Sequence, residues 1–364
     1  MKYITYFFRI VVGVIFIISG GVKTVDPIGF SYKLEEYFGP GVFDIPFLQE
    51  LALPIAIFFV VLEVLLGVFL LLGIWKRFTV YSVLLLIIFF AFLTFYSAYF
   101  NKVTDCGCFG EALKLAPWTS FWKDIALLVL ILFLVFGIKY TEPLFMPKVN
   151  LTLTGLIFIG CFWVVYQGIA HLPLIDFRPY AVGKDLKKGM NDGIPQEDMI
   201  IYTMENLKTR EEKKLSSDEY INTNIWQDTL NWKIKNMHTE IIREAVLPSV
   251  HDFVIDCGNE DTTEEVLNEA KIAVITIPFA KKLSVIERAE LRKIISDLAK
   301  KNIKFVVLTN EPEALSPIFS CFADQTTLKT INRSNPGLMI LKKGVVVAKY
   351  HVNDFPAVKE IEKL

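Results

Sequence analysis

The first half of the chain consists of long apolar runs separated by short polar segments. The runs cover about 3–22, 51–74, 78–100, 121–140 and 151–171. Each is close to the roughly 20 residues that an α-helix needs to cross a bilayer. Tyr and Trp side chains gather near the ends of the runs, which is typical of the membrane–water interface. The pattern therefore predicts five transmembrane helices.

After His171 the pattern changes to shorter strands and helices. Apolar runs at 271–279 and 303–310 predict two strands, and an amphipathic helix is expected between them over 283–300. The turn at Lys342-Lys343-Gly344 predicts a hairpin. This order of elements is typical of an α/β domain with a mixed sheet. The expected buried face of the helix consists of Ile286, Leu291, Ile294, Ile295 and Leu298.

Shorter segments complete the expected soluble half. A strand is predicted over 252–257, and Thr262 with Glu265 has the spacing of a capping box at the start of a helix. Further elements are expected as a strand over 199–204, a helix opening at Ser217, a short helix over 312–322 and a closing helix over 357–364.

Composition follows the same division. The chain has 364 residues, 53% of them hydrophobic and 21% charged, and only 21 of its 77 charged residues lie in 1–172. Such a chain is neither an ordinary soluble enzyme nor disordered. The net charge of −1 gives no reason to expect nucleic acid as a partner, so the expected partners are the lipid bilayer and another protein.

The positive charges of the short loops predict the orientation. Lys2 and Arg9 lie at the start, no cleavage site follows them, and we interpret the first run as a retained helix rather than a signal peptide. Lysine and arginine also fill the loops on that same side, which predicts a cytoplasmic N-terminus. Five spans then place residues after His171 outside, which is the periplasm in a bacterial inner membrane. The loop residues are Lys76, Arg77, Lys139 and Lys148.

The expected fold class is a membrane all-α four-helix bundle plus a fifth transmembrane helix, followed by a soluble α/β domain. The bundle is assigned to residues 1–142, and the fifth helix with its linker to 143–175. A mixed α/β extension is expected over 176–250, and the α/β domain over 251–364.

Cys106 and Cys108 form the first chemical candidate, in the segment Asp105-Cys106-Gly107-Cys108-Phe109-Gly110 after the third span. Two cysteines separated by one glycine are close enough to form a disulfide, and the small ring would make that disulfide easy to reduce. We favour a catalytic disulfide, with Lys102 or Lys123 lowering a thiol pKa. A structural staple, idle thiols and a metal site remain open, although a metal needs more ligands than two cysteines supply.

Glu63 is the second candidate, near the middle of the second span. A lone charge at that depth costs about 2.5–3.5 kcal/mol, so Glu63 should be protonated or paired, for example with Arg9. A proton route, a contact to a quinone-like headgroup and a packing ion pair are all open. A transporter-like conduit is a weaker alternative.

A third cluster follows the first span, where small residues Ser19 and Gly20 precede Lys23, and Asp26 precedes Pro27. Small residues let helices pack closely, and the proline should begin a new element. Lys123 and Asp124, at the start of the fourth span, could pair with this cluster or form a solvated ion pair at the interface. Together, the expected polar site of the membrane half comprises Arg9, Lys23, Asp26, Glu63 and Asp124.

The remaining cysteines have quieter interpretations. Cys161 lies inside the fifth run and is expected to be a small core residue. Cys257 and Cys321 could pair in the soluble half, but we favour two free thiols.

The membrane half resembles the DoxX/MauE group of small four-helix membrane proteins over about 4–140. The segment from Cys106 to Gly110 is the most specific match and points toward MauE. The resemblance implies a four-helix bundle linked to envelope redox chemistry. The other matching residues are Arg9, Gly13, Ser19, Gly20, Lys23, Asp26, Pro27, Glu63, Gly67 and Gly73.

Residues 252–364 resemble the thioredoxin-like fold. Asn335 and Pro336 stand where that fold places a cis-proline before its hairpin. The active cysteines should follow the strand 271–279, but residues 279–283 read Phe-Ala-Lys-Lys-Leu. The resemblance therefore implies a redox-inactive domain that holds a partner at the loop before Pro336.

We expect an inner-membrane redox protein in which Cys106 and Cys108 exchange a disulfide with a periplasmic or membrane partner. Electrons would pass to a quinone or to a second membrane protein. No motif for a soluble cofactor is visible. The alternative is a non-enzymatic scaffold or accessory subunit of an envelope complex.

Overall fold

A computed structural model describes residues 1–103, 107, 110, 112–113 and 115–364. Cys106 and Cys108 lie outside these residues. The chain forms two compact units, each described by itself below. The first combines Met1–Gly183 with Val254–Leu364, and the second is Lys184–Phe253.

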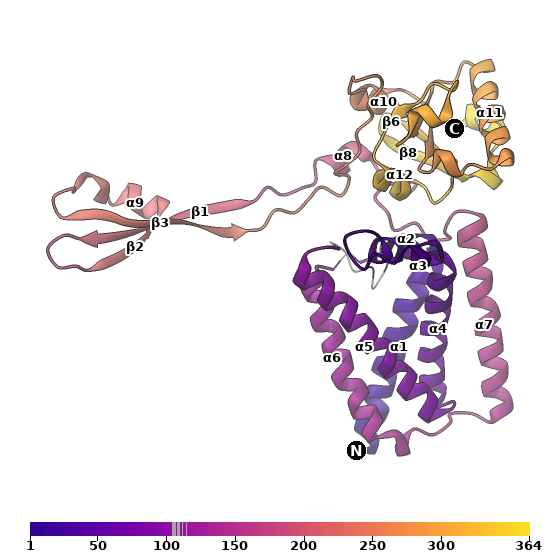
Figure 1. Ribbon diagram of the computed structural model, residues 1–364, viewed down its shortest axis with the longest axis horizontal. Coiled ribbons are helices and arrows are strands. Elements are labelled where there is room, and N and C mark those ends of the chain that lie inside the picture. The colour runs from indigo at the N-terminus through magenta and orange to yellow at the C-terminus, as the bar shows by residue number, and fades with distance from the viewer. Residues whose placement is uncertain (104–106, 108–109, 111, 114) are drawn as a thin grey trace. The chain divides into compact units, whose positions relative to one another are not determined.

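Among the described residues, five helices are long and apolar enough to cross a membrane, which confirms the expected spans (Figure 1). Their bounds differ from the predicted ones by a few residues, because polar residues at the ends continue the helices into the interface. The five helices are α1 (Lys2–Val25), α4 (Ala52–Leu72), α5 (Lys76–Phe100), α6 (Pro117–Phe136) and α7 (Pro147–Ala170).

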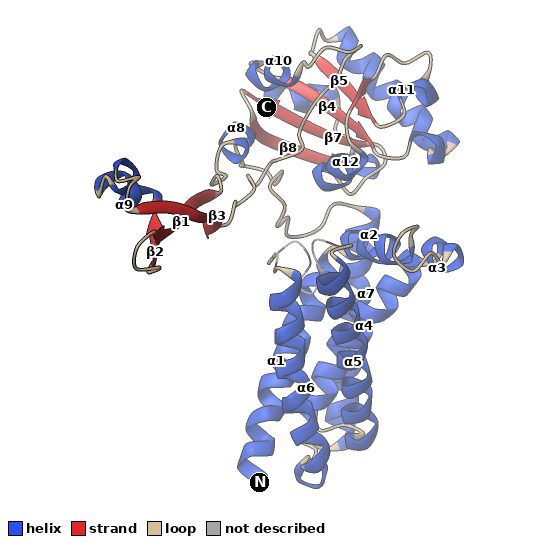
Figure 2. Ribbon diagram, turned by 60° about the vertical axis from the view of Figure 1, so that its left-hand side comes forward, coloured by secondary structure: helices blue, strands red, loops and turns tan. Residues whose placement is uncertain are grey.

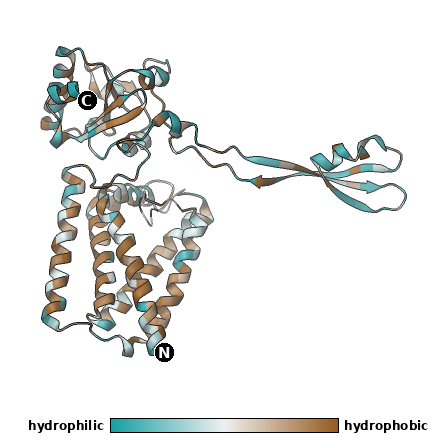
Figure 3. Ribbon diagram, turned by 180° about the vertical axis from the view of Figure 1, so that it is seen from behind, coloured by the Kyte–Doolittle hydropathy of each residue, from teal (hydrophilic) through white to brown (hydrophobic). Residues whose placement is uncertain are grey.

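Helices α1, α4, α5 and α6 share one apolar core, to which Val12, Leu66, Val83 and Ile131 contribute. Large apolar side chains also cover the outside of the bundle, and hydrophobic colouring predominates along these helices (Figure 3). A helix that is apolar all round is stable when lipid replaces water at its outer face. Helix α7 packs beside α4, and Cys161 is buried there, as expected for a core residue.

Two short helices, α2 (Pro27–Phe38) and α3 (Pro46–Glu50), connect α1 to α4. The new element at Pro27 was predicted. The Asp26 side chain caps it by accepting a hydrogen bond from the backbone N–H of Gly29 at 2.9 Å. Proline suits the first helical turn because its missing N–H has no intrahelical partner there.

The last third of the chain is an α/β domain built on a five-stranded sheet in the order β6-β5-β4-β7-β8 (Figure 2). Strands β4, β5 and β6 are parallel, and β7 and β8 form the expected antiparallel hairpin. Strand β4 is buried at every position, as its apolar run predicts. The strands are β4 (Ile272–Ile277), β5 (Phe305–Thr309), β6 (Cys321–Phe322), β7 (Gly337–Lys342) and β8 (Val345–His351).

Helices accompany this sheet, and helix α11 buries Leu291, Ile294 and Leu298 as predicted. Ile286, placed on the same face by the sequence pattern, is instead 77% exposed, and its neighbour Val285 in the first turn of α11 is 85% exposed. The closing helix is confirmed as α13. The helices are α10 (Thr263–Asn268), α11 (Val285–Lys300), α12 (Gln325–Ile331) and α13 (Val358–Lys363).

Three local predictions were wrong. Residues 252–257 form isolated bridges at Asp256 rather than a strand. The expected helix over 312–322 is a short 3-10 turn, Pro312–Leu315, followed by β6. The Thr262 hydroxyl does not cap α10; it lies 3.3 Å from the carbonyl of Ile255 and 3.2 Å from the sulfur of Cys257. In each case tertiary contacts at the sheet edge override the local pattern.

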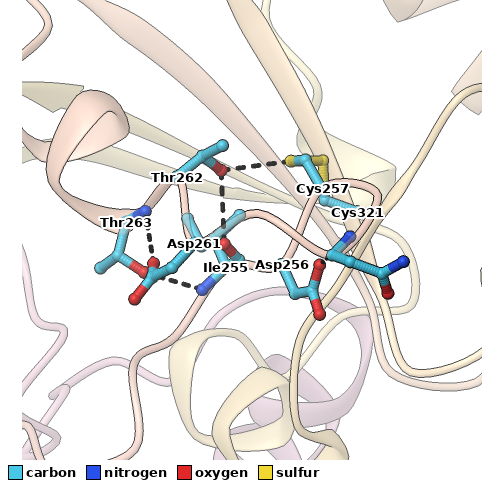
Figure 4. The surroundings of a disulfide bond; sticks show 8 residues. Ile255, Asp256, Cys257, Asp261, Thr262, Thr263 and Cys321 are labelled. Atoms are coloured by element: carbon cyan, nitrogen blue, oxygen red, sulfur yellow. Dashed lines mark hydrogen bonds between the residues drawn. A yellow bond between two sulfur atoms is a disulfide. The ribbon is translucent and has the colours of Figure 1, made fainter.

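Cys257 and Cys321 form a disulfide, so the expectation of two free thiols was wrong (Figure 4). The two cysteines are 64 positions apart, with Cα atoms 4.4 Å apart. Asp256 and Phe322 exchange backbone hydrogen bonds immediately beside them. This backbone bridge, which the sequence pattern does not reveal, brings the two sulfurs together.

The second unit contains a three-stranded antiparallel sheet in the order β2-β1-β3. The strand expected over 199–204 is part of β1, and the helix opening at Ser217 is α9, with Ser216 and Glu219 forming a capping box. The elements are α8 (Leu186–Met190), β1 (Glu197–Asn206), β2 (Glu212–Ser216), α9 (Ser217–Asn222) and β3 (Trp232–Arg243).

Candidate functional site

Close packing between α1 and α4 places the charged residues of the membrane half. A side chain added at Gly20 would meet the backbone nitrogen of Val64 at 2.9 Å, and one added at Gly67 would meet the carbonyl oxygen of Gly13 at 2.8 Å. Glycine therefore allows the two backbones to approach here. The packing brings Lys23 at the end of α1 beside Glu63 on α4.

Lys23 and Glu63 form a buried ion pair, with 2.5 Å between Nζ and a carboxylate oxygen and only 2% and 4% of the side chains exposed. The rings of Phe30 and Phe90 flank the ammonium group, with centroids at 5.2 and 4.8 Å. The pair compensates two charges that would be costly alone in this apolar surrounding. Glu63 is thus paired, as the sequence required, but with Lys23 instead of Arg9.

A second acidic group faces the same space. Asp124 on α6 is buried, lies 2.7 Å from Lys123 Nζ and accepts a hydrogen bond from the Thr94 hydroxyl at 3.1 Å. Both ion pairs line one cavity of about 30 Å³. That volume accommodates water and is too small for an aromatic ring.

The same cavity reaches Gly107, the residue between the two cysteines of the loop. Gly107 adopts a left-handed backbone with φ +63°. It lies against the side chain of Lys33 in α2, which a Cβ atom added at Gly107 would meet at 3.1 Å. The cavity therefore borders both ion pairs and Gly107, whose sequence neighbours are Cys106 and Cys108. The two cysteines themselves are outside the described residues.

Arg9 has a different role from the one suggested by the sequence. Its guanidinium donates hydrogen bonds to the carbonyl oxygens of Leu70, Leu71 and Glu142 at 2.7, 2.6 and 2.9 Å. Two of these carbonyls belong to the last turn of α4, where intrahelical partners are missing. Arg9 thus caps α4, and Gly73 next to it takes the left-handed conformation that ends the helix.

Asp26 also lies apart from the Lys23–Glu63 pair. Its carboxylate pairs with Arg333 of the α/β domain, at 2.9 Å from Nη2 and from Nε. Burial opposes ionisation of Asp26, but the charges of Arg333 and Arg178 prevail and hold the pKa of this carboxyl below its usual range. Asp26 therefore joins the end of α1 to the loop before β7.

An aromatic and cationic group extends this contact along α2. Tyr32 lies with its ring centroid 6.2 Å from that of Phe279, and the Lys329 ammonium is 4.6 and 4.9 Å from the two ring centroids. Lys329 also pairs with Glu35 at 3.5 Å. Burial raises the pKa of Tyr32 to about 12 and lowers the pKa of Lys329. We call Asp26, Tyr32, Glu35, Phe279, Lys329 and Arg333 the α2 seam.

Asn335 and Pro336 are the expected partner-binding residues, and Asn335 contacts the α2 seam at Phe279. The Asn335 side chain bonds the backbone N–H and carbonyl of Phe279 at 3.2 and 3.1 Å. Pro336 is buried, and the Asn335–Pro336 bond is cis, as the resemblance implied. Asn335 thus fixes the backbone of Phe279, whose ring contacts Tyr32 of α2.

A further buried cluster lies in the same unit. Asp176 accepts hydrogen bonds from Arg178 at 2.6 and 2.9 Å and from Lys349 at 2.7 Å. Despite its burial, these two cations lower the pKa of Asp176 to about 2. Burial and the Arg178 charge lower the pKa of Lys349 to about 7. The cluster fixes the chain between α7 and the α/β domain.

The sequence missed several members of these clusters. Thr94 carries no distinguishing signal, because Thr79, Ser82 and Ser97 are further hydroxyl residues of the same run. Lys33, Lys329 and Arg333 carry no such signal, because charged residues are common at the ends of helices and in loops. Lys329 and Arg333 contact residues about 300 positions away in the chain, as in the Asp26–Arg333 pair.

Residues 1–137 match the family model of methylamine utilisation protein MauE. The match covers α1 to α6 and includes every charged residue of the bundle cavity. With five long apolar helices, it identifies a membrane protein. No curated protein and no solved structure matches the chain.

Proposed function

We propose that this chain is an inner-membrane component of envelope thiol–disulfide chemistry, in which Cys106 and Cys108 exchange a disulfide with a partner protein. The observation that supports this proposal best is the bundle cavity, whose lining includes the buried Lys23–Glu63 pair, the partly exposed Lys123–Asp124 pair and Gly107. Similarity of residues 1–137 to MauE places this cavity in the matched part of the chain.

The proposed reaction transfers two electrons and releases protons, and residues of the cavity would accept these protons. A client dithiol reduces the Cys106–Cys108 disulfide, and the client leaves as a disulfide. The cavity at Lys23, Glu63 and Asp124 has space for water next to groups that hold and exchange protons. Lys33 beside Gly107 would favour the attacking or leaving thiolate.

The electron acceptor is proposed as a quinone or a second membrane protein. The cavity holds about 30 Å³, so a quinone ring would bind at the lipid-facing surface near the loop rather than between Lys23 and Glu63. The chain needs no soluble cofactor for this exchange.

The disulfide between Cys257 and Cys321 supports a periplasmic location for the α/β domain, because disulfides persist in oxidising compartments. With five spans, the N-terminus is then cytoplasmic. The Lys/Arg bias of the loops predicts the same orientation.

We propose a thioredoxin-like fold for residues 254–364. The parallel β5–β4 pair, followed by the antiparallel β7–β8 hairpin, supports this assignment. No cysteine occupies residues 279–283, so this position would serve for contact rather than redox chemistry. Phe279 already contacts Tyr32 of α2, which makes the chain's own bundle the first occupant of that face.

The test is labelling of intact cells with a membrane-impermeant, mass-shifting maleimide, before and after reduction. The matched control is the Cys106→Ser/Cys108→Ser variant, since reduction also exposes Cys257 and Cys321. We expect two additional labels after reduction in the wild-type chain compared with the variant. A mixed disulfide with a client should then accumulate in Cys108→Ser. If the double variant keeps full cellular function and partner binding, the redox proposal fails.

The second candidate is a non-enzymatic accessory subunit. The α2 seam favours it, because the face that a thioredoxin would offer to clients is already joined to the bundle. Under this proposal Cys106→Ser/Cys108→Ser should leave assembly with the partner complex unchanged, whereas under the redox proposal it should abolish the mixed disulfide with the client. Co-purification from detergent extracts distinguishes the two candidates.

A further inference from the structure

The disulfide of the α/β domain lies in the wall of a groove. The groove has a volume of about 510 Å³, within the size range of ligand-binding pockets, and both Cys257 and Cys321 line it. Most of its other lining is apolar, including the side chain of Phe319, which is 78% exposed. Both cysteines are therefore next to a surface that can hold another molecule.

The groove follows an incomplete sheet edge. Strand β6 pairs with Leu308 and Thr309 at the end of β5, and on its other side Phe322 bridges Asp256. Phe305, Val306 and Val307 precede that pairing and line the groove. An extended peptide can lie along such an edge and place alternate side chains in the groove.

Acidic residues that line the groove indicate the charge of the peptide that it would bind. Glu265 is exposed at the groove, and Glu269 next to it pairs with Lys304 at 2.5 Å. Glu265 therefore favours a basic residue in the occupant. A basic residue beside a cysteine also lowers the pKa of that thiol and increases its thiolate fraction.

We propose that this groove binds an extended, basic peptide segment carrying a reduced cysteine, and that the Cys257–Cys321 disulfide oxidises it. This goes beyond the proposed function, because the exchange requires neither Cys106 nor Cys108. The client is thus an apolar and basic protein segment with two thiols.

The step balances as a two-electron exchange. The first client thiolate attacks Sγ of Cys257, the Cys257–Cys321 bond breaks, and Cys321 leaves as a thiolate that takes a proton from water. The second client thiolate then attacks the client sulfur of the mixed disulfide, and Cys257 leaves. The client ends as a disulfide, and the protein holds two thiols, which a second protein disulfide reoxidises.

The two cysteines differ in a way that assigns these roles. Cys257 is half-buried, whereas Cys321 is 2% exposed within β6, so Cys257 is the accessible sulfur. The Thr262 hydroxyl lies 3.2 Å from Cys257 Sγ (Figure 4). A donor at this position stabilises the Cys257 thiolate when it leaves in the second step.

The experiment uses the full-length chain in detergent micelles, with Cys106→Ser and Cys108→Ser, so that only the second site is measured. The probe is a short fluorescent peptide with one cysteine flanked by valine and lysine. After acid quenching, mass spectrometry should locate the peptide adduct on Cys257. Dithiothreitol serves as the small-thiol reference.

Phe319→Ser tests the groove without breaking the disulfide. The adduct should form about tenfold more slowly, as expected when one apolar contact is removed from a binding site, whereas the rate with dithiothreitol should stay unchanged. Ile286→Ser is the matched control, because Ile286 is equally exposed but lies on α11, and it should leave both rates unchanged. A peptide with aspartate in place of lysine should also react more slowly.

Two results would overturn the proposal. The first is absence of a peptide adduct under conditions where dithiothreitol reduces the disulfide. The second is peptide reactivity that neither Phe319→Ser nor the aspartate peptide changes. In both cases the disulfide is a structural link. Since the cysteines of the loop are absent, neither result bears on the function proposed for them.

Discussion

The bundle and the α/β domain distribute charge in opposite ways. In the bundle, the ionisable groups Lys23, Glu63 and Asp124 are buried, and large apolar side chains cover the outside. In the α/β domain, β4 is buried at every position, and most Lys–Glu and Lys–Asp pairs lie on the surface. The same residue types thus occupy opposite positions in the two regions.

The difference shows how the surroundings decide what an ion pair contributes. Surface pairs between lysine and acidic residues contribute about 0–1 kcal/mol, because water competes for both partners. A buried pair is costly to break, because the remaining charge has no solvent. Substitution of the buried charges should therefore lower the stability of the bundle most. In the α/β domain, we expect the largest loss of stability from removal of the disulfide.

The largest effect is expected from Glu63→Leu. The substitution leaves the Lys23 ammonium buried without its carboxylate and should lower the free energy of unfolding by about 3–5 kcal/mol. Denaturant unfolding in detergent micelles measures it. The double variant Lys23→Met/Glu63→Leu should recover most of the loss, because two apolar side chains replace the pair. Equal stability of Glu63→Leu and the wild-type chain would contradict an ion pair at this position.

Removing the Cys257–Cys321 disulfide should come next. The bond closes a segment of 64 positions, and its loss through Cys257→Ser/Cys321→Ser should destabilise the α/β domain by about 4 kcal/mol in the chain-entropy estimate. Limited proteolysis mapped to Val254–Leu364 reports this change. Cys161→Ala removes a buried but unbridged thiol and should cost about 1 kcal/mol. If both variants resist protease equally, the disulfide does not stabilise the domain.

Arg9→Lys should have a smaller effect within the bundle. Lysine keeps the charge but not the planar fork that reaches Leu70, Leu71 and Glu142, so we expect a loss of about 2 kcal/mol in the free energy of unfolding. Arg77→Lys, at an exposed arginine of α5, is the control and should change it by at most about 0.5 kcal/mol. Identical thermal midpoints for the two variants would show that Arg9 does not cap α4.

An effect similar in size to that of Arg9→Lys concerns pH and Lys349. Its pKa is about 7 in the folded chain and 10.5 when unperturbed. Between these values the unfolded chain binds the proton and the folded chain does not, so stability of the α/β domain should rise as pH increases from about 7 toward 10.5. Urea midpoints between pH 7 and 9 measure this rise. Lys349→Met should flatten it, and a fall with pH in the wild-type chain would contradict the assignment.

The sequence determined most of the regular elements, because these depend on local composition and periodicity. Runs of about 20 apolar residues can hardly form anything except membrane helices, and a short continuous apolar run such as that of β4 is typical of a strand buried on both faces. The need of Glu63 for a partner also followed from sequence, since a lone carboxylate is costly in lipid. These inferences need no knowledge of which segments meet.

Tertiary structure decided the identity of every partner. Glu63 pairs with Lys23 because glycines let α1 and α4 approach closely. Arg9 instead donates hydrogen bonds to carbonyl groups at the end of α4. Cys257 and Cys321 pair because a backbone bridge joins segments 64 positions apart. Asp26 binds Arg333 across the length of the chain. Such contacts depend on how whole helices and strands pack, and the sequence around each partner carries no local signal of the pairing.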